Sequence, residues 1–248
     1  MNNKYHNLIK RHSTISLLFF KEQINEPIAI LWTIISPCVF FYFMTLTTTR
    51  AGNLPEDYIT IASWFFSYIA FSTALFGCSF YLIGRRESGF VRSFIYQRSS
   101  IALYLSAHIT GYSFIAIFYC TSFYLLTLPT YGTYSLTELL NLLLRFFICY
   151  TYFSSIGLLI ALLPIKFSTA STIFSIISFT TLSLSYLNAT PENTITTLNT
   201  LNPLILAQSF IRAPTHLFET TMGAIALLLS CSLVLYKYLR VQPVWSRY

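Results

Sequence analysis

Two ionisable side chains, His108 and Arg145, lie inside long apolar stretches of the sequence. An ionisable group within a membrane-spanning helix is usually functional or paired with another polar group. His108 could relay protons, or it could be a hydrogen-bonded packing residue, since no acidic residue is near it in the sequence. Arg145 could serve the function of its span, or its long side chain could extend to the membrane surface near Glu138.

The sequence lacks the residues of an ATP-hydrolysing site. No G-x-x-x-x-G-K-[ST] pattern occurs and the eight glycines are scattered, so no phosphate-binding loop is available. The five cysteines fall in apolar stretches without CxxC spacing, which favours small buried residues over metal or redox chemistry. We therefore expect that the chain is not an enzyme, and we expect no catalytic residue, cofactor or metal in it.

The composition is that of a membrane protein. Of the 248 residues, 55% are hydrophobic and only 9% are charged, whereas about 25% of the residues in an ordinary soluble domain are charged. A soluble helix needs a polar face toward water, so most of this chain must face lipid. The net charge of +7 is spread between apolar runs, which is typical of membrane topology signals, and we expect no nucleic-acid partner.

Six stretches are long and apolar enough to cross a bilayer, which requires about 20 residues with few or no charges. We expect an all-α integral membrane protein. Its predicted spans are residues 28–49, 58–84, 100–128, 139–163, 168–187 and 219–238. The turn residues at 128–132 divide a long uncharged run into two spans. Residues 188–218 contain three prolines and are too broken for a span, so we expect short or re-entrant helices there.

The basic residues predict the orientation of these spans. Most of the 15 Lys and Arg residues fall in the segments that six spans would place on one side, together with both termini. The acidic residues between the spans gather mainly on the other side. By the positive-inside rule, both termini are expected in the cytoplasm.

The N-terminal segment, residues 1–26, has an amphipathic pattern. Lys4, Lys10, Arg11 and Lys21 alternate with apolar residues at roughly helical spacing. This pattern predicts a helix that lies on the membrane surface, and the alternative is a basic leader that only sets the topology.

The loop at about 87–97 has a second amphipathic pattern. Phe90, Val91, Phe94 and Ile95 form an apolar stripe at helical spacing. This stripe must rest on the bilayer surface or on a partner protein, because it cannot remain in water.

These features resemble the ABC-2 family of exporter permeases over nearly the whole chain. Leu31-Trp32 followed by Pro37 is similar to the family's opening pattern in the first span. Asn202-Pro203 resembles the Asn-Pro segment before the last span.

The loop between the second and third spans carries the other part of the resemblance. Glu87-x-Gly89, followed by the amphipathic stretch and Ser99-Ser100, resembles the first cytoplasmic loop of the family. The usual proline before these serines is absent, because the chain reads Gln97-Arg98-Ser99-Ser100, and this leaves the end of the loop helix undefined.

The resemblance implies a transmembrane domain at residues 27–248 that works as a dimer, with a second copy or a related permease. A separate cytoplasmic ATPase subunit would bind ATP and Mg²⁺. The residues expected to couple to it are Arg86, Glu87, Gly89, Phe90, Val91, Phe94 and Ile95. Residues 188–218 would form extracellular re-entrant helices. The protein would reside in the bacterial inner membrane and export an amphiphilic substrate, such as a peptide, drug, lipid or glycan.

Two other classes of function are compatible with the spans. A secondary transporter driven by an ion gradient usually carries carboxylates near the middle of the membrane, and the predicted spans contain none there. A membrane scaffold or assembly protein would need neither an ATPase nor a polar cavity.

Overall fold

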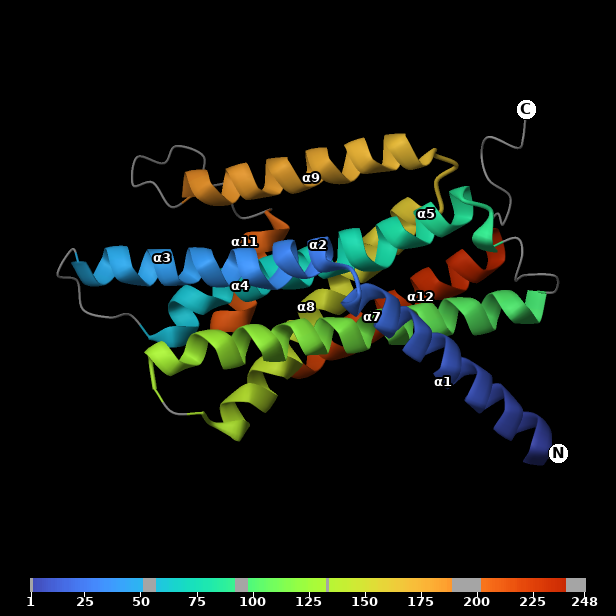
Figure 1. Ribbon diagram of the computed structural model, residues 1–248, viewed down its shortest axis with the longest axis horizontal. Coiled ribbons are helices and arrows are strands. Elements are labelled where there is room, and N and C mark those ends of the chain that lie inside the picture. Colours follow the sequence, from blue (N-terminus) through green and yellow to red (C-terminus); the bar gives the residue numbers. More distant parts are fainter. Residues whose placement is uncertain (1, 51–56, 92–97, 133, 189–201, 240–248) are drawn as a thin grey trace.

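The computed structural model describes residues 2–50, 57–91, 98–132, 134–188 and 202–239, and within these ranges every regular element is a helix. The helices are α1 (Asn2–Ile24), α2 (Pro27–Ile30), η1 (Leu31–Ile35), α3 (Ser36–Arg50), α4 (Tyr58–Ser72), η2 (Thr73–Phe80), α5 (Tyr81–Glu87), α7 (Arg98–Thr127), η3 (Leu128–Thr130), α8 (Leu136–Ala161), α9 (Phe167–Asn188), α11 (Pro203–Arg212) and α12 (Leu217–Tyr238). Several of these elements are continuous with one another, so α2, η1 and α3 form one long helix, as do α4, η2 and α5 (Figure 1).

Six of the described helices are long and apolar enough to cross a membrane, as the sequence predicts. They comprise Pro27–Thr47, Tyr58–Glu87, Ser100–Thr130, Leu136–Ala161, Phe167–Ser185 and Leu217–Tyr238. The prediction of six spanning helices in an all-helical chain is therefore confirmed by length and composition.

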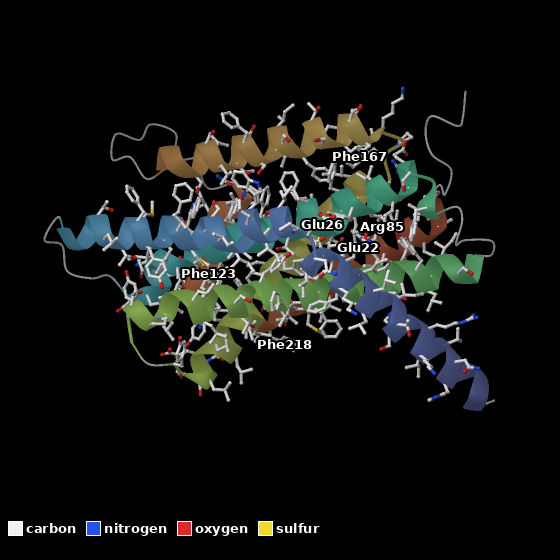
Figure 2. All side chains as sticks on the ribbon, viewed as in Figure 1. Glu22, Glu26, Arg85, Phe123, Phe167 and Phe218 are labelled. Carbon is white, nitrogen blue, oxygen red and sulfur yellow. The ribbon has the colours of Figure 1, made fainter. Side chains whose placement is uncertain are left out.

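Aromatic side chains fill the centre of the bundle. The ring of Phe123 on α7 lies 5.8 Å from that of Phe41 on α3 and 5.0 Å from that of Phe66 on α4, in edge-to-face contacts. Phe66 also meets Phe146 on α8 at 6.5 Å. Such pairs are favoured by the charge distribution of the rings, so this cluster joins four helices; Figure 2 labels Phe123 within it.

The outer helices expose large apolar surfaces. α9 lies along one side of the bundle and α12 packs mainly on α8 (Figure 1). Ile176 and Phe179 on α9, and Phe218 and Leu229 on α12, are exposed. Apolar surface of this extent is unstable in water and suits a bilayer.

One end of the bundle is rich in cations, and we call it the basic end. α5 and α12 end there, and α7 and α9 begin there (Figure 1). Arg85 and Arg86 lie near the end of α5, Lys237 lies near the end of α12, and Lys166 directly precedes α9. α1 packs on α7 and leaves the bundle at the same end (Figure 1).

Two predicted segments fall partly outside the described residues. The loop helix predicted at 87–97 begins within α5, which ends at Glu87, and residues 92–97 lie outside the described part. In the segment 188–218, α11 is a short helix, and residues 189–201 lie outside the described part.

Candidate functional site: a polar groove within the bundle

The first and second spans each contain a π-helical segment, a rare form that is often found at functional sites. In η1, the Ser36 N–H bonds to the Leu31 carbonyl, five residues back. Pro37 explains the position of η1, because proline cannot donate to the Thr33 carbonyl and its ring would clash with it.

The second π-helical segment, η2, has no proline and depends on packing. The Ser79 hydroxyl donates to the Ala74 carbonyl, again five residues back, at 3.1 Å. The Cys78 carbonyl lies 2.8 Å from Nε2 of His108 on α7, so a neighbouring helix satisfies it. These two bonds stabilise the wider turn from inside the bundle.

The two π-helical segments border a groove with a volume of about 410 Å³. The rest of its wall comes from the α1–α2 junction and from α2, α4, α5, α7 and α9. Its polar lining residues include Gln23, Glu26, Thr33, Thr73 and Tyr119. Its aromatic lining residues are Trp32, Tyr68, Phe76, Phe80, Tyr81 and the same Tyr119. The groove therefore combines hydrogen-bonding groups with large apolar rings, as ligand sites usually do.

Two hydroxyl groups in the groove wall are not satisfied by the described part of the protein. Oγ1 of Thr73 and the hydroxyl of Tyr119 are buried and have no partner in good hydrogen-bond geometry among the described residues, although the Tyr119 hydroxyl lies near the side chains of Gln23 and Thr33. A buried polar atom without a partner is unfavourable and needs an explanation in a native structure. Both residues line the groove, but their oxygen atoms are covered by neighbouring atoms, so a molecule in the groove would reach them only after a local rearrangement.

The chemistry available in this groove is non-covalent binding. Glu26 is its single carboxylate among the described lining residues, and none of them is a Lys or Arg. No group of three His, Cys, Asp or Glu side chains suitable for a metal occurs in the described part of the chain. The groove can therefore hold an amphiphile that is neutral or carries a positive charge.

Arg85 connects α5 to α1 at the basic end. Its Nη2 donates to Oε2 of Glu22 at 2.6 Å, and its guanidinium lies 4.1 Å from the centre of the Phe19 ring. Figure 2 labels Glu22, Glu26 and Arg85 near this junction of α1 with the bundle. A short charge-assisted bond with an aromatic contact fixes the end of the second span against the N-terminal helix.

Arg86 connects α5 to the α8–α9 connection. Its Nη1 donates to the carbonyls of Ala161 at 2.8 Å and Leu163 at 3.1 Å, and its Nη2 donates to that of Ile165 at 2.9 Å. These carbonyls lie at and just beyond the end of α8, where a helix leaves acceptors without intrahelical partners and carries partial negative charge. The planar guanidinium suits this cluster of acceptors.

The other residues predicted to couple to an ATPase follow Arg86 directly. Glu87 is buried and accepts from Nε of Arg86 at 3.1 Å. Gly89 has a φ of +78°, a conformation that glycine adopts without strain, and it ends α5. Val91 is buried, whereas Phe90 is 39% exposed. Phe94 and Ile95 lie outside the described residues.

The two ionisable residues within the apolar stretches both bond to backbone carbonyls. His108 is fully buried, its Nε2 bonds to the Cys78 carbonyl, its Nδ1 has no partner among the described residues, and its ring contacts those of Phe19 and Tyr112. Nη1 of Arg145 donates to the Ile211 carbonyl at 2.9 Å, at the C-terminus of α11. These are the surroundings of a packing histidine and of an arginine that caps a helix C-terminus.

The remaining residues of the family-like pattern lie on the first span and at the start of α11. Leu31 and Trp32 are exposed on the first span, and Trp32 lines the groove. Oδ1 of Asn202 accepts from the Leu204 N–H at 3.0 Å, which caps α11, and its Nδ2 donates to the Thr181 carbonyl at 2.9 Å. Pro203 follows at the first helical position, where its missing N–H is harmless.

The sequence did not predict the groove or the bonds that Arg85 and Arg86 form with other parts of the bundle. Pro37 was an available signal for η1, but nothing in the sequence marks η2. The partners of Arg85 and Arg86 lie far away in the sequence, so no local pattern identifies them.

The fold and the groove define a multi-pass helical protein of membrane type, with an open groove of mixed apolar and polar lining along its first two spans. No family model matches the sequence. The chain is similar to Protein McbE of Escherichia coli, with 26% identity over 238 residues. This similarity extends over 94% of the present chain and 97% of that protein, so it covers nearly all of both.

Proposed function

We propose that this chain is the transmembrane permease subunit of an ABC-2 type exporter. It would form the path of an amphiphilic substrate out of the cytoplasm and couple to a separate ATPase subunit that binds ATP and Mg²⁺. A second copy of the chain, or a related permease, would complete the membrane part.

The observation that carries this proposal is the polar groove in a six-span bundle. Thr73 and Tyr119 place buried hydroxyls in its wall, with Glu26 as its carboxylate. Buried hydroxyls without a full hydrogen-bond partner lower the stability of a protein. A scaffold protein would gain nothing in return for this cost. A transported molecule that moved the groove wall would give these groups a partner during its passage.

The connections at the basic end support coupling to a partner. The loop that begins at Gly89 directly follows Arg85 and Arg86, which bond to α1 and to the α8–α9 connection. A force on this loop would therefore reach two other parts of the bundle through short charge-assisted bonds. Phe90 would contact the ATPase, together with Phe94 and Ile95.

The charge distribution supports the proposed orientation. With both termini in the cytoplasm, the basic end would face the cytoplasm, in agreement with the positive-inside rule. α1 would then lie at the cytoplasmic surface, and α11 would belong to the extracellular re-entrant region. The similarity to a protein of Escherichia coli supports a bacterial inner membrane.

An ion-gradient mechanism is less well supported by the described spans. Their carboxylates, Glu87, Glu138 and Glu219, lie in the first or last turns of their helices. Coupling to an ion gradient usually depends on ionisable groups near the middle of the membrane.

The test compares two double variants of the tagged chain in its native host. Phe90→Asp with Phe94→Asp should abolish retention of the ATPase subunit, because carboxylates would replace the apolar contact. The matched control is Leu136→Asp with Thr137→Asp, since both residues are exposed in the first turn of α8, where carboxylates are tolerated. Equal ATPase retention by both variants would show that the loop is not the coupling element.

A further inference from the structure

A large cleft lies between α1 and α7 at the basic end and is separate from the polar groove. Its volume is about 1360 Å³, and Arg85, Ser88 and Phe90 close it on the side of α5. The cleft and the groove share no lining residue. On α1, Glu22 lines the cleft, and the next residue, Gln23, lines the groove.

The cleft has an excess of positive charge. Lys10, Arg11 and Arg85 line it, together with one carboxylate, Glu22. Glu22 is paired with Arg85. Lys10 and Arg11 are exposed and form no ion pair within the described part of the chain. Two cations are therefore available for an anion.

The same cleft has an apolar wall. Ile15 and Leu18 on α1 and Leu103 on α7 line it. On α1, Leu18 is 54% exposed and the adjacent Leu17 is 64% exposed. A free inorganic anion gains nothing from such a surface, whereas an acyl chain does. The cleft thus combines the two chemistries of a phospholipid.

The position of the cleft along the bundle agrees with the level of lipid headgroups. The second span ends at Glu87 and the third begins at Ser100. Ser88 and Ser100, the residues at these ends, both line the cleft. Cations between helices at a membrane surface are typical of sites for anionic lipid headgroups.

We propose that the cleft between α1 and α7 binds the headgroup phosphate of an anionic phospholipid through Lys10 and Arg11, with an acyl chain along Leu18 and Leu103. This binding would hold α1 on the membrane surface beside α7. The inference does not depend on the exporter function, because it rests on the cleft alone.

The experiment measures saturable binding of phosphatidylglycerol to the purified full chain in detergent, followed by native mass spectrometry, with phosphatidylcholine as the reference lipid. Lys10→Gln with Arg11→Gln should weaken phosphatidylglycerol binding about 30-fold, since each cation near an anionic headgroup contributes about fivefold. The matched control is Lys21→Gln with Lys166→Gln, which removes two exposed cations from outside the lining of the cleft and should bind like the unmodified chain.

Two further arms separate a lipid from a free anion. Leu18→Gln leaves every cation in place, and a lipid site predicts weaker phosphatidylglycerol binding. Inorganic phosphate should not displace the lipid. The proposal would be overturned if phosphatidylcholine bound as well as phosphatidylglycerol, or if both double variants lost phosphatidylglycerol binding equally. Full phosphatidylglycerol binding by Leu18→Gln, or displacement of the lipid by inorganic phosphate, would also overturn it.

Discussion

Replacing Arg86 with methionine should destabilise the whole bundle, because this side chain joins the end of the second span to the α8–α9 connection. The substitution removes three hydrogen bonds to carbonyls, those of Ala161, Leu163 and Ile165. It also removes one partner of the buried Glu87 carboxylate. Methionine retains an apolar chain of similar length but has no donor.

The expected loss follows from the number and kind of these bonds. A hydrogen bond to a charged group contributes about 1.5–3 kcal/mol, and removing one member of a buried ion pair costs about 3–5 kcal/mol. Water at the end of the bundle can satisfy part of the released carbonyls, so the contributions do not add. We expect a loss of about 3–5 kcal/mol in the free energy of unfolding, or on the order of 10 °C in Tm for a chain of this size.

Thermal unfolding of the purified chain, followed by size-exclusion chromatography with fluorescence detection, measures this loss. Arg86→Lys should lose less than Arg86→Met, because an ammonium group keeps the charge but cannot match the planar fork. Lys166→Met is the control, since Lys166 is exposed on the same connection, and it should change stability by no more than about 0.5 kcal/mol. If Arg86→Met unfolds at the same temperature as Lys166→Met, the reasoning is refuted.

Three other substitutions test the packing and the groove. Gly157→Ala should cost about 1–3 kcal/mol of stability, because its Cβ would meet the Ser79 Cβ at 2.9 Å; Gly132→Ala, with nothing within 4 Å, should be close to neutral in the same thermal assay. Arg145→Met should speed amide hydrogen exchange at the C-terminal turn of α11, whose carbonyls it caps, and unchanged exchange there would contradict the capping role. Tyr119→Phe should change the free energy of unfolding by no more than about 1 kcal/mol, because the buried hydroxyl has no partner in good hydrogen-bond geometry among the described residues, and it should lower transport; a large loss of Tm would show that Gln23 or Thr33 satisfies this hydroxyl.

The spans could be predicted because membrane crossing depends on the length and composition of local segments. Each apolar run is interrupted by charges or turn residues, as at Pro129 and Gly132, and these local signals do not need tertiary contacts. Asn202 before Pro203 was a similar local signal, and in the structure it caps α11.

The groove and the arginine connections could not be predicted, because they depend on residues distant in the sequence. η2 is stabilised by a bond between His108 and the Cys78 carbonyl, 30 residues apart. Arg86 is bonded to a carbonyl 75 residues away. The loop pattern identified Arg86 as part of a cytoplasmic segment, but the continuation of α5 to Glu87 makes it part of the buried end of a span.

The most direct test of the proposed function is purification of the tagged full chain in mild detergent from its native host, followed by identification of the stoichiometric partners and an ATP hydrolysis assay. The exporter account predicts a soluble ATPase subunit in a fixed ratio to the chain, with Mg²⁺-dependent hydrolysis in the complex. Absence of any ATPase from a stable, monodisperse preparation would contradict the account.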